Sequence, residues 1–189
     1  MKKVYIIHGY GATAANHWFS WLQDQARAHG ATATALTLPD SENPDFSAWQ
    51  QGLHDAIGMP QADDIFVAHS LGVISLLHYL TAMSPQQIGG LVLVSGFVDK
   101  LPGFAAIGDF DMDDFIARAN VNLSKIAAMT PEITCVISDN DHVVPSALSH
   151  QLAEKLRGRV VSVAGGGHFL GREGFTELPQ AWQAVAALL

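Results

Sequence analysis

Three residue types that together carry out acyl transfer occur along this chain in the order Ser70, Asp141 and His168. Each lies just beyond an apolar run of strand length, within the stretches "VAHSLG", "DNDHVVP" and "GGGHFL". Acyl transfer needs a hydroxyl that attacks, an imidazole that takes its proton and a carboxylate that orients the imidazole. The three stretches therefore predict a catalytic serine with its base and its acid.

The stretch around Ser70 is close to the G-x-S-x-G nucleophile elbow, with Ala68 in place of the first glycine and Gly72 as the last. Small residues two positions before and after the serine let a strand and a helix pass closely. Ala68 adds only one methyl group, so we interpret the stretch as a variant of the elbow. The alternative is that Ser70 merely caps a helix beginning at Leu71.

The acid has three candidates. Asp141 opens a D-x-x-V-P pattern and is favoured, Asp139 would form the turn before it, and Asp99 follows an earlier strand. The base is predicted to be His168, because three preceding glycines free the backbone to swing an imidazole toward the sheet. Ser, Asp and His in this order are typical of the α/β-hydrolase fold.

An oxyanion hole needs two N–H donors. The stretch "HGYG" at 8–11 and the residue after Ser70 suggest the backbone amides of Tyr10 and Leu71, while His8 and His69 are expected to shape their turns. Four aromatic residues could line an apolar acyl pocket, although packing in the core or the lid is favoured for each: Trp18, Phe97, Phe104 and Phe110.

The elements that must position these residues alternate between strand and helix. Nearly continuous apolar runs, typical of strands covered on both faces, lie at 4–7, 65–68, 91–94, 133–137 and 160–164, with a weaker run at 32–38 nearer an edge. Helical spacing occupies 17–30, 46–58, 71–83, 146–156 and 179–189. This alternation predicts an α/β fold with about six mostly parallel strands, helices on both faces, and a site beyond the strands' carboxyl ends.

One segment does not fit the alternation. Residues 96–131 are too long for a simple crossover, so we expect a short lid-like insertion at about 97–130, with one or two short helices over one end of the sheet. No linker or repeat is evident, which favours a single domain over 1–189.

The composition limits the kinds of molecule that this chain is expected to bind and where it is expected to lie. The formal net charge is −8, with 18 acidic residues against 10 lysines and arginines, which argues against nucleic acid or an anionic membrane as the main partner. The apolar run at the start is too short for a signal peptide, and no stretch approaches a membrane span, so we expect a cytoplasmic protein. Cys135 is the only cysteine, so no intramolecular disulfide forms.

Two further motifs are weaker. "DFDMDD" at 109–114 begins like a calcium loop but lacks its turn glycine, and the histidines show no zinc spacing, so no metal is expected. "GYGATA" at 9–14 matches a dinucleotide fingerprint and would make the chain an NAD(P)-dependent oxidoreductase, with Asp40 on the ribose. However, Asp40 lies about 30 residues beyond Gly9 rather than the usual roughly 20.

With "VYIIHGYGATAANHWFSWL", "VAHSLG", "LVLVSGF", "DNDHVVP" and "GGGHFL" in place, the chain resembles a family of small serine hydrolases that includes bacterial YdeN proteins and retinoblastoma-binding protein 9. The resemblance spans nearly the whole length. It implies a compact α/β-hydrolase that lacks the N-terminal strands of larger members. It also implies a Ser-Asp-His triad, whose roles fall on Ser70, Asp141 and His168.

These observations predict a serine hydrolase, most simply a carboxylesterase that acts on small acyl esters without a cofactor. Thioesters and amides remain open as substrates, and no protein partner is indicated. Since fold does not fix function, the alternative from another class is a protein-interaction module that retains the fold without the chemistry.

Overall fold

A computed structural model describes residues 1–189 and contains one six-stranded sheet in the order β2-β1-β3-β4-β7-β8. Every neighbouring pair is parallel. The strands are β1 (Lys3–Ile7), β2 (Thr32–Ala35), β3 (Asp64–His69), β4 (Gly90–Val94), β7 (Ile133–Ser138) and β8 (Arg159–Val163). The predicted α/β class is confirmed, and the weak run at 32–38 supplies an edge strand.

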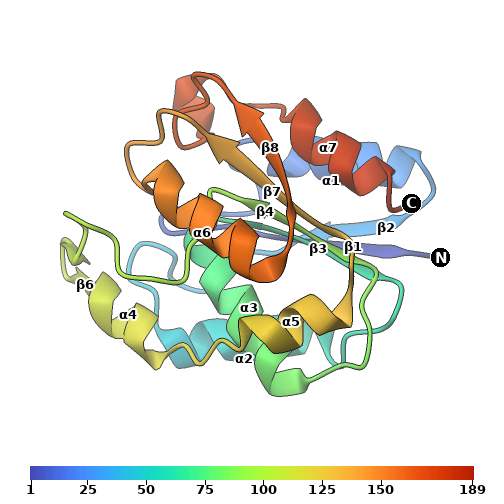
Figure 1. Ribbon diagram of the computed structural model, residues 1–189, viewed down its shortest axis with the longest axis horizontal. Coiled ribbons are helices and arrows are strands. Elements are labelled where there is room, and N and C mark those ends of the chain that lie inside the picture. The colour runs from blue at the N-terminus through green and yellow to red at the C-terminus, as the bar shows by residue number, and fades with distance from the viewer.

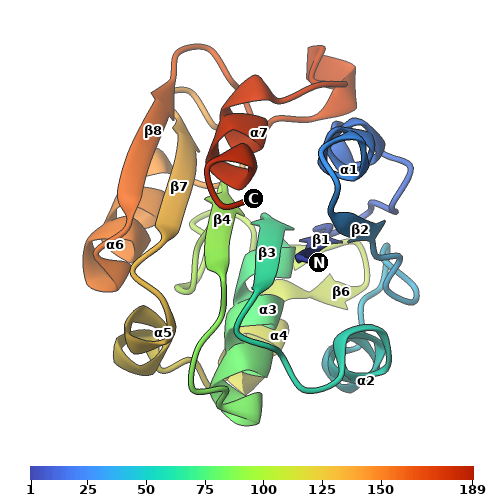
Figure 2. The same ribbon diagram turned by 90° about the vertical axis from the view of Figure 1, so that its right-hand side faces the viewer.

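Helices cover both faces of this sheet (Figure 2). Helices α1 (Phe19–Ala28) and α7 (Pro179–Ala186) pack together on one face, and α2 (Phe46–Ile57), α3 (Leu71–Met83) and α6 (Ser146–Leu156) cover the other. Side chains of each strand alternate between the two cores, so Phe66 of β3 faces α3 while Val67 faces α1 and α7. Burial on both faces explains why the central strands are apolar at nearly every position.

The insertion between β4 and β7 contains a small hairpin and two short helices, β5 (Ala106–Ile107), β6 (Phe110–Asp111), α4 (Met112–Arg118) and α5 (Leu123–Met129). The two helices were expected, whereas the hairpin was not, because two-residue strands leave no periodic pattern. Helix α5 packs against α3 and α6, and β6 with α4 lies at the carboxyl end of the sheet (Figure 1).

Cys135 lies inside β7, where burial raises the pKa of its thiol to about 12. A thiol of this kind stays protonated near neutral pH and acts as a small apolar side chain. None of the helices combines the length and the apolar character needed to cross a bilayer.

Candidate active site

Strand β3 passes into helix α3 through Ser70, whose backbone is strained. Its φ of 54° lies in the left-handed region, which non-glycine residues adopt uncommonly. The Ser70 N–H donates to the Val94 carbonyl at 3.0 Å, and the side chain makes no capping bond to α3. Ser70 is therefore held in an elbow and does not serve as a helix cap.

Packing around the elbow explains its small residues. A Cβ on Gly72 would lie 2.3 Å from the His8 carbonyl oxygen, so only glycine fits between α3 and the end of β1. Ala68 is fully buried and opposite Ile7 of β1 and Leu93 of β4 in the sheet register. Its methyl group packs in the core beneath α3. No backbone passes as close to this methyl group as the His8 carbonyl passes to Gly72.

The structure brings Ser70, His168 and Asp141 into one chain of hydrogen bonds. The Ser70 hydroxyl lies 2.9 Å from His168 Nε2, and His168 Nδ1 lies 2.8 Å and 3.0 Å from the two Asp141 carboxylate oxygens. An ionised carboxylate only accepts, so Nδ1 carries the proton and Nε2 presents its lone pair to the serine hydroxyl. This is the tautomer that a general base for Ser70 requires.

Both oxygens of the Asp141 carboxylate accept hydrogen bonds from neighbouring groups. The Ser95 hydroxyl donates at 2.7 Å, and the N–H groups of Val143 and Val144 both donate at 2.9 Å. Burial raises the pKa of Asp141, but hydrogen bonding and attraction from His168, with the donors at Ser95 and Val144, outweigh it and lower the pKa below its ordinary value. Asp141 therefore stays ionised beside the imidazole.

The competing aspartates lie elsewhere. Asp139 is exposed and accepts from the Gly165 N–H at 2.8 Å, which ties the loops after β7 and β8 together. Asp99 is exposed and pairs with Lys155 at 3.8 Å. Neither contacts His168.

Two side chains hold the backbone of His168, Glu173, which the sequence pattern missed, and His69, which was expected only to shape its own turn. One oxygen of Glu173 accepts from the N–H groups of His168 and Leu170, each at 2.9 Å. On the other side, His69 Nε2 donates to the His168 carbonyl at 2.9 Å. Burial lowers the pKa of His69 well below its ordinary value, so it works here as a neutral donor.

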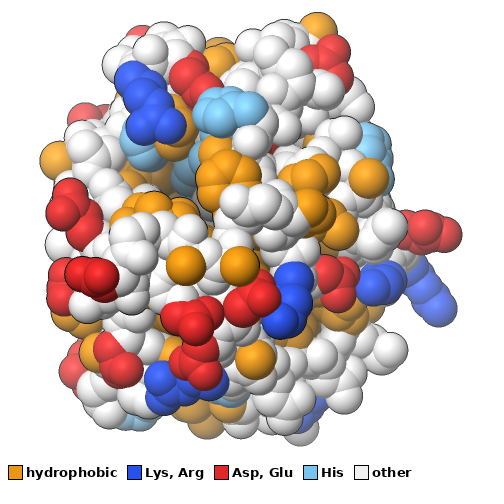
Figure 3. Space-filling view, turned by 90° about the vertical axis from the view of Figure 1, so that its left-hand side faces the viewer, with side chains coloured by type: hydrophobic (Ala, Val, Ile, Leu, Met, Phe, Trp, Pro, Cys, Tyr) orange, Lys and Arg blue, Asp and Glu red, His pale blue; other side chains and the backbone are white.

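A cavity of about 340 Å³ opens beside Ser70 and His168. Figure 3 looks onto this carboxyl edge and shows the surface hollowed there, with histidine and hydrophobic side chains around the hollow. Most of the wall is apolar, and its hydrophobic members are Tyr10, Leu101, Phe104, Ile107, Met112, Val143 and Leu170. The volume falls at the small end for ligand sites, which suits a small substrate.

The four aromatic residues considered as possible pocket lining fall into two groups. Phe104 does line it, and Phe110 lies behind the wall, stacked on Tyr10 with ring centres 5.3 Å apart. Trp18 and Phe97 do not reach it: both are fully buried, Trp18 beside Phe19 on the α1 side and Phe97 in the core on the α3 side. Their hydrophobicity serves packing, which sequence alone does not distinguish from lining a pocket.

Two backbone donors lie near the elbow. The Tyr10 N–H has no acceptor within the protein, and the Leu71 N–H, first in α3, has none within its helix. His8 fixes this loop: its Nδ1 donates to the Gly9 carbonyl at 2.7 Å and its Nε2 accepts from the Leu38 N–H at 2.8 Å. Burial lowers the pKa of His8, which keeps this neutral tautomer in place.

The dinucleotide fingerprint lacks its structural context. The glycines of 9–14 do not open a helix, since α1 begins only at Phe19, and a pyrophosphate site needs that helix N-terminus.

In the acidic stretch at 109–114, Asp111 caps α4 and Asp113 pairs with Lys100 at 2.7 Å. The acidic stretch is therefore explained by helix capping and an ion pair.

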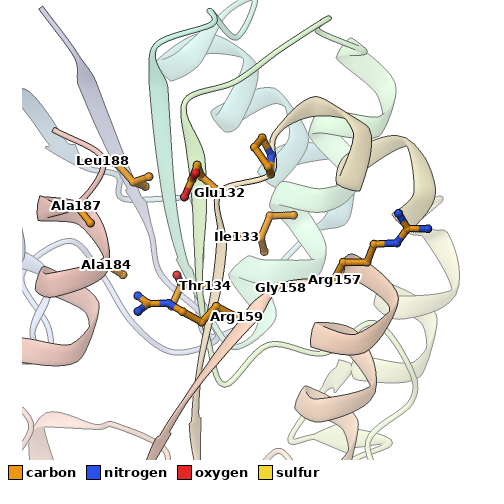
Figure 4. Close-up of a pocket in the computed structure, with 10 residues that line it drawn as sticks. Glu132, Ile133, Thr134, Arg157, Gly158, Arg159, Ala184, Ala187 and Leu188 are labelled. Atoms are coloured by element: carbon orange, nitrogen blue, oxygen red, sulfur yellow. The ribbon is translucent and has the colours of Figure 1, made fainter.

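A larger cavity of about 500 Å³ lies at the opposite end of the sheet (Figure 4). It is bordered by the starts of β7 and β8 and the end of α7, and its two arginines, Arg157 and Arg159, point away from one another. No histidine, serine or cysteine lines it. Of the two cavities, only the one beside Ser70 brings a nucleophile and a base together.

Known proteins resemble this chain over most of its length. The sequence profile of the serine hydrolase family matches residues 4–187. The hydrolase YdeN of Bacillus subtilis is 34% identical over 187 residues, covering 98% of this chain and 95% of YdeN. The serine hydrolase RBBP9 of Rattus norvegicus is 25% identical over 178 residues, 90% of this chain and 87% of its own length.

Solved structures show the same fold. The crystal structure of the B. subtilis ydeN gene product superposes with a TM-score of 0.91 at 33% identity, covering 100% of this chain and 98% of that one. Est1E from Butyrivibrio proteoclasticus shares the fold at a TM-score of 0.72 and 14% identity, over 99% and 88% of the two chains. The predicted resemblance is confirmed, and the chain belongs to the serine hydrolase family.

Proposed function

We propose that this hydrolase cleaves small carboxylic esters through an acyl-enzyme on Ser70, with His168 as general base and Asp141 as the residue that orients it. The observation that carries the proposal is the unbroken hydrogen-bond chain from Ser70 through His168 to Asp141, which opens on an apolar cavity. The hydrolytic class follows from the family, and the hydrogen-bond chain supports the proposed roles of the three residues.

In the first half of the reaction, His168 Nε2 takes the Ser70 proton as the oxygen attacks the ester carbonyl. Asp141 stabilises the imidazolium that forms, while the amides of Tyr10 and Leu71 receive the developing negative charge on the carbonyl oxygen. The carbon–oxygen bond to the alcohol then breaks, and the alcohol leaves with the proton from His168. The acid part remains on Ser70.

In the second half, water takes the place of the alcohol. His168 removes a proton from the water, which attacks the acyl carbon, and Ser70 leaves with that proton restored to its hydroxyl. The apolar wall contributed by the insertion fits a short acyl chain, because it lines a cavity at the small end of the range for ligand sites.

Labelling with a fluorophosphonate, followed by mapping of the modified peptide, tests the proposal. We expect one adduct on Ser70, none in Ser70→Ala, and hydrolysis of para-nitrophenyl butyrate by the wild type alone. Folded wild-type protein that takes no adduct at Ser70 would instead support the interaction module and overturn the proposal. The same assay with the matched thioester and anilide ranks the three acyl classes.

A further inference from the structure

The cavity beside Ser70 contains one cationic side chain without a partner. Arg172 lines this cavity, is exposed, and takes part in none of the ion pairs of the protein. No aspartate or glutamate lines the cavity, although the chain carries eight more acidic than basic residues. A single positive charge in this position is left for a ligand to neutralise.

The acidic neighbour in sequence, Glu173, does not provide that neutralisation. Its Oε2 accepts from the N–H groups of His168 and Leu170, and its Oε1 lies 3.4 Å from His142 Nδ1. These contacts occupy its carboxylate on the turn that carries His168.

His17 supplies a second donor at the cavity. The Gly171 N–H donates to its Nδ1 at 2.9 Å, so the proton of the neutral ring is on Nε2, which has no partner within the protein. Burial lowers the pKa of His17 to about 4; the Arg172 charge, and a positive charge on His168 when it is protonated, lower it as well, while the Glu173 carboxylate partly offsets them. His17 and Arg172 both line this cavity, and the hydrogen bond from Gly171 ties His17 to the turn that carries Arg172. The imidazole can therefore act beside the guanidinium as a neutral N–H donor.

The reaction geometry decides which part of an ester meets them. His168 must deliver its proton to the alcohol oxygen, so the alcohol lies on the side of the segment that carries His168. Arg172 belongs to that segment, and His17 is bonded to it through Gly171. The apolar wall from the insertion is left for the acyl chain.

We propose, building on the proposed function, that the substrate is an ester between a short apolar acid and an alcohol carrying a carboxylate, which Arg172 and His17 bind. A planar guanidinium matches the two oxygens of a carboxylate, and the imidazole N–H adds a neutral donor. Cleavage breaks the bond between the acyl carbon and the alcohol oxygen. The hydroxy acid leaves with the proton from His168, and water later releases the apolar acid.

Two esters with the same acyl group and ring test this: para-butyryloxybenzoate and its methyl ester, which differ in charge. The quantity measured is kcat/KM for the carboxylate divided by kcat/KM for its methyl ester, in the wild type, Arg172→Gln and Arg159→Gln. Arg159→Gln removes the same charge at the distant cavity of Figure 4, so it controls for the overall charge of the protein. Comparing ratios between variants cancels the different intrinsic reactivity of the two esters.

We expect Arg172→Gln to lower the ratio about fivefold, as fits one charge pair at an exposed rim, and Arg159→Gln to leave it unchanged. Arg172→Glu should lower it further. An unchanged ratio in Arg172→Gln, or an equal loss in Arg159→Gln, overturns the assignment. In that case labelling of Ser70 and cleavage of the methyl ester persist, whereas failure of the proposed function removes both.

Discussion

The backbone N–H of His168 donates to the Glu173 carboxylate at 2.9 Å, and the same oxygen accepts from Leu170. The proposed base thus stands on a turn closed by an acidic side chain five residues later. Gly167 makes room for it: its φ is +53°, and a Cβ there would lie 2.7 Å from the Glu173 carboxylate. The position of the imidazole depends on this closure.

Glu173→Ala should therefore lower kcat by about 100-fold with KM little changed, since a displacement of about 1 Å at a catalytic group has an effect of this size. Glu173→Gln retains an oxygen that accepts both N–H groups and should keep most of the activity. Steady-state kinetics on para-nitrophenyl butyrate, with thermal unfolding to check the fold, provide the measurement. Wild-type kcat in Glu173→Ala would contradict the role.

Asp141→Asn should reduce kcat by about four orders of magnitude, because an amide N–H facing Nδ1 favours the imidazole tautomer that cannot accept the Ser70 proton. Asp139→Asn is the matched control. It keeps the oxygen that accepts from Gly165, so its effect should stay below about tenfold. If the variant at position 139 were the inactive one, Asp141 would not be the acid.

The two small residues flanking Ser70 should respond differently. Ala68→Gly should keep Ser70 reactive toward fluorophosphonate at a cost of about 1 kcal/mol in unfolding free energy, for one buried methyl and a more flexible strand. Ala68→Leu should lose the labelling while the protein still unfolds cooperatively.

Gly72→Ala should lower the free energy of unfolding in urea by about 3 kcal/mol, because its methyl group meets the His8 carbonyl. A Gly72→Ala protein of wild-type stability would contradict this packing.

Protonation of His17 should make the protein less stable as pH falls. Its pKa is about 4 in the folded protein, against 6.5 ordinarily, so the unfolded chain binds a proton that the folded chain rejects. The contribution is complete above pH 6.5 and is lost between 6.5 and about 4; solvent around the partly exposed ring reduces it to about 2 kcal/mol. Urea unfolding at a series of pH values measures it.

His17→Asn is the variant for that experiment. Asparagine tolerates the φ of 53° at this position and offers an oxygen near the place of Nδ1, but it does not titrate. The decline of unfolding free energy below pH 6.5 should become shallower, though not flat, because His8 and His69 have lowered pKa values too. Identical slopes in the two proteins would rule out His17 as a source.

The sequence was informative about the sheet because its central strands are buried on both faces. All six positions of β3 and of β7 are buried, which leaves a continuous apolar run that few other elements produce. The hairpin of β5 and β6 left no such signal, since each strand has only two residues. Its existence depends on tertiary contacts of the insertion with the rest of the fold.

At the site, residue types in loops after successive strands were enough to anticipate that Ser70, Asp141 and His168 would meet. Trp18 and Phe97 show the limit of that reasoning, because hydrophobicity suits a core and a pocket equally. Ser95 and Glu173 were missed because they act through a hydroxyl and through backbone N–H groups, contacts that depend on folded geometry and follow no motif.

The insertion between β4 and β7 places the coding sequence for much of the apolar cavity wall apart from that for the groups proposed to react. The apolar wall residues Leu101, Phe104, Ile107 and Met112 are encoded in one short continuous stretch, whereas the groups proposed to react are encoded outside it. Recombination that exchanged this stretch between relatives would change the apolar wall of the cavity and leave Ser70, Asp141 and His168 in place. If the proposed function holds, selection can therefore change the substrate range of such an enzyme without first lowering its catalytic rate.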